Sequence, residues 1–156
     1  MENNAIKTVQ EWLIAEGWTL KALTHENTQW LIEARDPEKR PFLISQQKTP
    51  GDQIRIQATL AFDQSAQSDF AALPKDKKDR YFWELKFGLL QMGLNFVGLG
   101  EPLQRVVLTK HLYIDGFNKN LFIHTLDMVR NALLMVLWAL HREMAKDPDI
   151  TGQMIH

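Results

Sequence analysis

Two side chains, His124 and Asp127, have types and spacing close to those of a metal-binding or polar site. They are three residues apart, so on a helix they share one face, where an imidazole nitrogen and a carboxylate can hold one metal ion. A metal site needs further ligands, and the spacing indicates none. A solvated polar stripe that also includes Asn120 and Asn131 explains the pair as well. We therefore keep His124 and Asp127 as a candidate polar site and expect no bound metal and no cofactor.

Side chains that could act as nucleophiles are few. The chain has no cysteine, which excludes thiolate catalysis, disulfides and cysteine-ligated metal centres. Ser45, Ser65 and Ser68 are its serines, and none lies in the Gly-x-Ser-x-Gly turn that exposes a hydrolase nucleophile. Glu33 and Glu84 would form a catalytic carboxylate pair only if the fold brought them together. We name no catalytic residue, and the pattern favours a protein that is not an enzyme.

A short glycine motif resembles part of a dinucleotide-binding loop. Such a loop follows a strand and opens a helix, whereas Gly98-Leu99-Gly100 follows an expected helix and precedes an expected strand. We interpret this motif as the terminator of the helix.

A basic cluster lies beside two aromatic residues, a combination also found in proteins that bind nucleic acids. The cluster is Lys75, Lys77, Lys78 and Arg80, next to Tyr81 and Trp83. Asp76 and Asp79 interrupt it, and the whole chain has a formal net charge of -1. Alternating charges at a helix start indicate a solvated face, so we expect no nucleic-acid partner.

These residues must be positioned by a mixture of helices and strands. Ile6, Val9 and Leu13 recur at helical spacing and Gly17 suits a left-handed helix end, which predicts a helix over 4–16. Between 18 and 62, apolar and polar residues alternate between turns at 25–27, 36–39 and 50–52, which predicts four antiparallel strands. The clearest alternation predicts a buried apolar face and an opposite polar face. The apolar face carries Ile54, Ile56, Ala58, Leu60 and Phe62, and the polar face carries Arg55, Gln57 and Thr59.

The remaining chain is predicted to form a loop, a helix, a strand and a helix. The loop covers 63–75, and the helix covers 76–97 with Asp76 as its N-cap and a wide apolar face. A fifth strand follows over 103–114 and a last helix over 118–146. We predict one α+β domain over 4–146, with helices on one side of an antiparallel sheet of about five strands and three helices in the order α-β-β-β-β-α-β-α. A frayed tail is expected over 147–156.

In the order and lengths of these elements, the chain resembles the type III secretion chaperone-like fold, which includes the YbjN-type bacterial regulator domains. The resemblance is carried by the meander from Trp18 to Phe62, the helix from Asp76 to Val97, the strand from Leu103 to Ile114 and the helix from Asn118. It implies a bacterial homodimer that binds peptides or proteins and has no enzymatic activity.

The last helix contains nine consecutive apolar residues, 132–140, so no face of this segment is suited to water. It needs cover from the sheet and also from the second helix or from another copy of the chain. Because both helices have more apolar surface than one sheet requires, we expect a homodimer with Leu134, Met135 and Trp138 at its interface. Nine residues fall short of the roughly 20 that span a bilayer, so we expect no membrane partner.

The composition is that of an ordinary globular chain, with 45% hydrophobic and 24% charged residues. The first twelve residues lack the pattern of a signal peptide, and with the absence of cysteine this predicts a cytoplasmic location. The predicted function is a non-catalytic protein- or peptide-binding module, chaperone-like or regulatory, that acts as a homodimer with an unknown protein or peptide partner. The alternative is a small-ligand-binding protein or enzyme with a cleft lined by the aromatic second helix.

Overall fold

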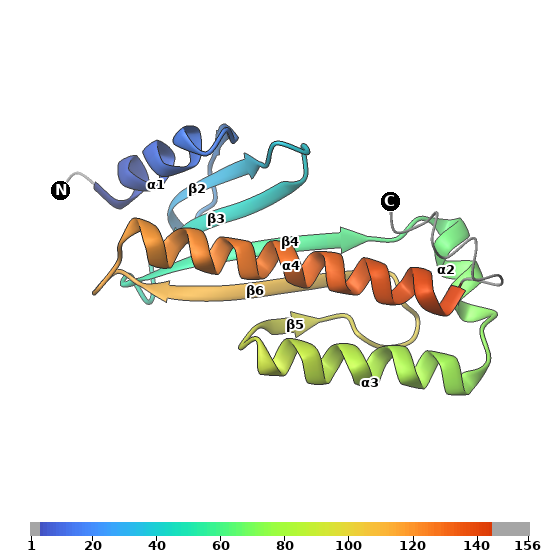
Figure 1. Cartoon of the computed structure of the whole chain (residues 1–156). Coiled ribbons are helices and arrows are strands. Elements are labelled where there is room, and N and C mark those ends of the chain that lie inside the picture. The colour runs from blue at the N-terminus through green and yellow to red at the C-terminus, as the bar shows by residue number, and fades with distance from the viewer. Residues whose placement is uncertain (1–3, 145–156) are drawn as a thin grey trace. The chain divides into compact units, whose positions relative to one another are not determined.

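The computed structural model describes residues 4–144 and has the predicted α+β class (Figure 1). Its antiparallel sheet has six strands in the order β1-β2-β3-β4-β6-β5 rather than about five, and the described residues form four helices rather than three. The elements are α1 Asn4–Ala15, β1 Thr19–Leu23, β2 Thr28–Arg35, β3 Pro41–Gln47, β4 Gln53–Ala61, α2 Gln64–Ala71, α3 Lys75–Gln91, β5 Asn95–Val97, β6 Arg105–Tyr113 and α4 Lys119–Met144. The chain forms two compact units, which are described separately below.

Unit 1 contains residues 4–58 and 109–127, which include α1, β1 to β3, the first part of β4 and the end of β6. Ile32 pairs with Ile44 and Ile44 with Ile56 across the antiparallel strands, and all three are fully buried. The alternation in β4 is confirmed in this unit, because Ile54 and Ile56 are fully buried while Arg55 and Gln57 stay partly exposed. A pleated strand presents successive side chains to opposite faces, so β4 has one apolar and one polar face.

The predicted first helix and its glycine end are also confirmed. Gly17 has a φ of 84°, and its N–H donates to the carbonyl of Ile14 at 3.0 Å. The N–H of Trp18 donates to the carbonyl of Leu13, also at 3.0 Å. These two bonds form the Schellman motif that satisfies the last carbonyls of a helix. Trp18 and Leu13 are both buried, and the Trp18 ring lies 5.5 Å from that of Phe42.

Unit 2 contains residues 59–108 and the described residues from 128 onward, which include α2, α3, β5 and the adjoining parts of β4, β6 and α4. Phe70, Tyr81 and Phe82 form an aromatic cluster at its core, with ring centroids 5.3–5.6 Å apart in edge-to-face geometry. Such rings combine a large buried apolar area with favourable quadrupole contacts. Leu85 and Leu89 of α3 extend this core.

The prediction of a loop over 63–75 is wrong, because residues 64–71 form α2. Asp63 caps this helix, its Oδ1 accepting from the N–H of Ala66 at 2.7 Å. Gln67 donates through Nε2 to the carbonyl of Phe62 at 2.8 Å, and Phe70 is the buried anchor. A single large apolar residue cannot produce a helical hydrophobic period in the sequence. The N-cap and the burial of Phe70 against the rest of the unit therefore stabilise this helix.

The predicted second helix over 76–97 has wrong ends. It starts at Lys75 after Pro74, so Asp76 lies inside its first turn and is not the N-cap. It stops at Gln91, because Gly93 takes a φ of 70° and a second Schellman motif closes the helix. Residues 95–97 then form β5, and the terminator is therefore Gly93 and not Gly98-Leu99-Gly100.

The last helix, α4, is confirmed over most of its predicted length. Asn118 accepts the N–H of Leu121 through Oδ1 at 2.8 Å, which satisfies a free donor at the helix start. Among the described residues, α4 is long and apolar enough to cross a membrane, a property that buried helices of water-soluble proteins share. Residues 145–146 and the expected tail over 147–156 lie outside the described residues.

Gly98 and Gly100 provide a matched pair of substitutions. Gly98 has a φ of 96°, and a Cβ there would lie 1.9 Å from the carbonyl oxygen of Arg105. We expect Gly98→Ala to lower the free energy of unfolding by more than about 2 kcal/mol, because both its backbone conformation and the overlap are unfavourable. A Cβ at Gly100 meets no atom within 4 Å, so Gly100→Ala should change it by less than about 0.5 kcal/mol. Urea unfolding measures both, and equal losses would contradict this prediction.

Candidate functional site

A groove of about 640 Å³ runs along the second half of α4 in unit 2, next to α3. We call it the α3–α4 groove. Its walls are apolar and consist of Leu85, Leu134, Met135, Trp138 and Ala139, and its polar edges are Glu84, Asn131 and Arg142. This volume and lining are typical of a binding site rather than of a packing defect.

A glycine brings the two helices together at this groove. A Cβ at Gly88 of α3 would lie 3.1 Å from Sδ and Cε of Met135 on α4, a distance that requires the methionine to move. Arg80, two turns earlier on α3, contacts Glu143, two turns later on α4, so the helices run antiparallel. The side of α4 that carries Leu134 and Trp138 stays partly exposed beside α3.

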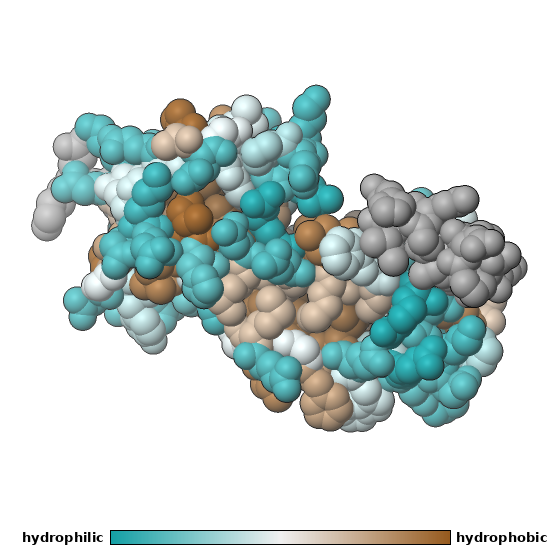
Figure 2. All heavy atoms as spheres, viewed as in Figure 1, coloured by the Kyte–Doolittle hydropathy of each residue, from teal (hydrophilic) through white to brown (hydrophobic). Residues whose placement is uncertain are grey.

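The residues predicted to mediate self-association lie on this open side. Leu134, Met135 and Trp138 follow one another at helical spacing, and all three line the groove. Leu134 and Met135 are half-buried, whereas Trp138 is 48% exposed. The opposite face of the same segment is buried through Ala132, Leu133, Val136 and Leu140. Figure 2 shows tan and brown side chains gathered over α3 and the second half of α4.

The aromatic residues of α3 divide between core and solvent. Tyr81 and Phe82 are buried, whereas Trp83 and Phe87 are exposed and stack on each other at 5.8 Å. Nζ of Lys86 lies 5.2 Å from the Trp83 ring, within the range of a cation–π contact. The second helix does line the groove, through Glu84 and Leu85, while its aromatic rings lie in the core or in solvent.

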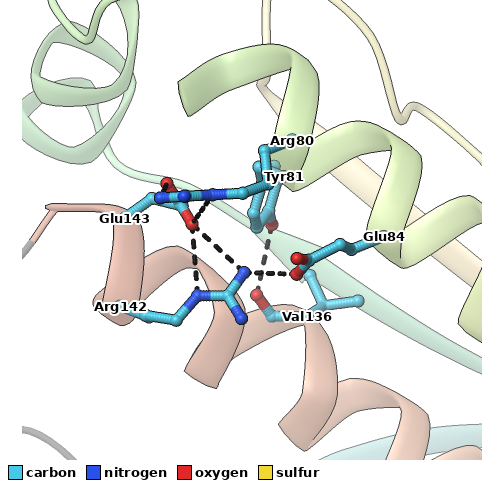
Figure 3. A network of polar contacts seen from close by, with 6 residues as sticks. All are labelled: Arg80, Tyr81, Glu84, Val136, Arg142 and Glu143. Atoms are coloured by element: carbon cyan, nitrogen blue, oxygen red, sulfur yellow. Dashed lines mark hydrogen bonds and ion pairs between the residues drawn. The ribbon is translucent and has the colours of Figure 1, made fainter. Parts of the chain in front are cut away.

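A buried carboxylate joins the two helices at one end of the groove (Figure 3). Glu143 is 1% exposed and accepts two bonds from Arg80, Nε to Oε1 at 2.9 Å and Nη2 to Oε2 at 2.7 Å. Arg142 donates from Nε to Oε1 of Glu143 at 3.1 Å, and its Nη2 also bonds Glu84. Two-pronged arginine–carboxylate contacts are directional as well as strong, so they fix the register of α3 against α4.

Two cations and one phenol of this network have raised pKa values. Hydrogen bonds to Glu143 raise the pKa of Arg80, and the hydrogen bond to Glu84 raises that of Arg142. Burial raises the pKa of Tyr81, whose hydroxyl donates to the carbonyl of Val136 at 3.2 Å. Charged hydrogen bonds of this kind stabilise the packing of α3 against α4.

The histidine, aspartate and serine residues singled out in the sequence do not line the α3–α4 groove, and the polar site of His124 and Asp127 stays a prediction. His124 and Asp127 are exposed on α4 in unit 1, and within residues 4–144 no group of three or more His, Asp or Glu side chains could hold a metal. Ser45 is buried in β3, and Ser65 and Ser68 are exposed on α2.

The candidate carboxylates and the basic cluster are engaged in ion pairs. Glu33 pairs with Arg35 at 3.5 Å, and Glu84 pairs with Arg142. Three of the four basic residues in the cluster form ion pairs at 2.7–2.8 Å: Lys75 with Asp79, Lys78 with Glu101 and Arg80 with Glu143. A cation paired in this way contributes less to a positive surface.

Comparison with known proteins identifies relatives of the fold. A family model described as "Uncharacterized conserved protein (DUF2299)" matches residues 5–140. The crystal structure of an uncharacterized protein from Methanothermobacter thermautotrophicus has a TM-score of 0.79 and 24% identity, over 89% of this chain and 98% of that chain. None of the curated proteins matches the sequence. These findings confirm the α+β class, while the resemblance to the secretion-chaperone fold stays a prediction.

The buried carboxylate gives a prediction for stability. We expect Glu143→Gln to lower the free energy of unfolding by about 1–3 kcal/mol, because a buried site loses its negative charge and one of the two oxygens that accept from Arg80 and Arg142. Glu38→Gln is the control, since Glu38 pairs with Arg40 at 2.7 Å but is 61% exposed, and its loss should stay below about 1 kcal/mol. Urea unfolding compares the two, and an equal loss would show that burial of Glu143 is unimportant.

His111 of β6 gives a prediction for pH. It accepts a hydrogen bond through Nε2 from Nε of Arg55 at 3.3 Å. Burial, and next the charge of Arg55, lower the pKa of His111 below its ordinary value of 6.5. Between the lowered pKa and 6.5 the unfolded chain binds a proton that the folded chain does not, so acidification destabilises the fold in that window. We expect the free energy of unfolding to fall as the pH drops below about 6.5. His111→Gln should remove the part of this fall that comes from protonation of His111.

Arg55→Gln separates the two causes of this pH dependence. It removes the positive charge but leaves the burial of His111, so the contribution should shrink without disappearing. Urea unfolding at several pH values tests all three proteins. Identical pH profiles for the original protein and His111→Gln would rule the prediction out.

Proposed function

This chain belongs to the DUF2299 family, and we propose that it is a non-catalytic protein-binding module, chaperone-like or regulatory, that acts as a homodimer through the α3–α4 groove. The observation that carries the proposal is the combination of a half-exposed tryptophan ring and an apolar groove on one surface. Trp138 is 48% exposed and lines the groove of about 640 Å³. A two-fold interface uses the same patch on both copies, so the ring of one copy can fill the groove of the other.

The residue types around Trp138 support this occupant. Tryptophan and methionine are enriched in the buried centres of protein interfaces, and Met135 adapts to an incoming ring because its side chain is flexible. Leu134 adds apolar area on the same side of α4. The exposed side chains of Trp83, Phe87 and Leu90 add apolar surface on α3, and a stable interface needs more than about 1,000 Å² in total.

The charges at the groove edge are self-complementary as well. Arg142 and Glu84 both line the groove and are about half exposed, so each copy presents one cation and one anion there. In a two-fold arrangement each charge can lie opposite its counterpart on the other copy. The formal net charge of -1 per chain adds little repulsion between copies.

The alternative occupant is a small apolar ligand. The groove volume lies within the roughly 300–1,000 Å³ range of small-molecule sites, which is the observation that favours this second candidate. It would make the chain a small-ligand-binding protein with Trp138 and Met135 as its contacts. A small ligand leaves the protein monomeric, so the oligomeric state separates the two candidates.

Sedimentation velocity at micromolar concentration tests the proposal. We expect a dimer, and Trp138→Ala should raise its dissociation constant at least about tenfold because a central tryptophan is lost from both copies. Tyr113→Ala is the control, since Tyr113 is 59% exposed on β6 and does not line the groove. A monomeric protein that binds small apolar molecules only when Trp138 is present would support the alternative. An equal effect of both substitutions would contradict the groove as the interface.

A further inference from the structure

The polar face of the sheet in unit 1 carries a row of side chains that the proposed function does not use. Leu31 of β2 pairs with Ser45 of β3, and Ser45 pairs with Arg55 of β4. Arg55 in turn donates to His111 of β6. Residues directly opposite one another in a sheet point to the same face, so four strands contribute one side chain each to this row.

A pocket of about 210 Å³ lies on this face. Its polar lining is His25, Thr28, Ser45, Gln47, Arg55 and Gln57, and Leu31 and Leu43 form its apolar wall. No aspartate or glutamate of the described residues lines it. The pocket therefore combines one permanent cation with several neutral polar groups.

The hydrogen-bond partner of Arg55 is a neutral imidazole. The lowered pKa of His111 keeps that imidazole uncharged near pH 7, so it accepts the Nε–H of Arg55 and adds no charge. By contrast, Arg35, Arg80 and Arg142 each face a carboxylate. Across residues 4–144, no carboxylate forms an ion pair with Arg55, and its side chain lines the pocket.

Two neighbours have hydrogens available to donate. Nδ1 of His25 accepts the N–H of Asn27 at 3.2 Å, an arrangement that places the proton of a neutral ring on Nε2. Oγ of Ser45 accepts from Nε2 of Gln47 at 3.0 Å, so the hydroxyl hydrogen of Ser45 remains available. Together with Arg55, these groups make the pocket rich in donors.

We propose that this pocket binds a small anion that carries a carboxylate or phosphate group, with Arg55 as its principal contact. The planar guanidinium has two parallel donors that match two oxygens of either group. Ser45 and His25 would donate to the remaining oxygens, and the aliphatic wall of Leu31 and Leu43 would exclude water from one side. A volume of about 210 Å³ is below the range of drug-sized sites, so it suits one acidic group with few attached atoms.

The experiment is an NMR titration of the ¹⁵N-labelled protein with sodium phosphate, sodium acetate and, at equal ionic strength, sodium chloride. We expect saturable shifts of the Ser45, Arg55 and Gln57 amides and of the Arg55 Nε–H with phosphate, acetate or both, and none with chloride. Saturable shifts with phosphate alone would indicate a phosphate ligand, and saturable shifts with acetate alone would indicate a carboxylate ligand. The pocket does not include α3 or α4 residues, so the result is independent of the α3–α4 groove.

Variants connect the shifts to the guanidinium. Arg55→Gln should weaken anion binding at least about tenfold, the loss expected from a charge-assisted two-pronged contact. Arg35→Gln is the control, because Arg35 lies on the same sheet but pairs with Glu33 and does not line the pocket. Should Arg55→Gln not fold, Arg55→Lys is the second variant. It keeps the positive charge but lacks the two parallel N–H donors, so it should still weaken anion binding. Equal shifts with chloride, no saturable shift, or unchanged affinity in the Arg55 variant that folds would overturn the proposal.

Discussion

The apolar segment of α4 is the constraint on which the architecture of unit 2 depends. Nine consecutive apolar residues need cover on every side, but the core takes in only Ala132, Leu133, Val136 and Leu140 completely. Gly88 lets α3 approach Met135 closely, and this covers part of a second side. The remaining side carries Leu134 and Trp138, which a monomer leaves partly in water. Burying that surface is favourable at roughly 25 cal/mol per Å², and this is the physical reason to expect an occupant.

The polar network at the end of the groove determines which arrangement of α3 and α4 is stable. A buried carboxylate without partners is strongly unfavourable, so any sliding of the helices that separated Glu143 from Arg80 would be penalised. Apolar contacts are less directional than this two-pronged contact, although the fit of Met135 against Gly88 supports the same register. Hydrophobic burial thus provides the attraction in unit 2, and the Arg80–Glu143 contact specifies the register.

Local signals explain what could be predicted from the sequence. The alternation in β4 and the Gly17 helix end are encoded within a few residues, and both are confirmed. The two elements that were missed are those with weak local signals: α2 has one buried anchor, Phe70, and β5 has three residues. Gly93 was available as a helix end, but the apolar residues that follow it imitate a continuing helical stripe.

Some site residues could be named from the sequence, whereas others are brought together only by the fold. Leu134, Met135 and Trp138 could be named from the sequence, because an apolar helix segment must have an outer face whatever the topology. Arg80 and Glu143 are 63 residues apart and Arg55 and His111 are 56 apart, so only the fold brings them together. Each of these four residues resembles an ordinary surface charge or histidine in the sequence. Burial distinguishes Glu143, and the neutral partner distinguishes Arg55.

The charge balance of the two sites differs, and this difference determines what each can bind. In the α3–α4 groove the arginines and glutamates neutralise one another, so no long-range field favours an ion there. Apolar area and shape then decide the occupant, and a surface of both signs suits a second copy of itself. On the polar face of unit 1, by contrast, Arg55 forms no ion pair with a carboxylate of the described residues, and no such carboxylate lines its pocket. A half-buried cation attracts an anion more strongly than a fully solvated one, because the surrounding water screens it less. The proposed dimer surface and the proposed anion pocket therefore favour partners of different chemistry.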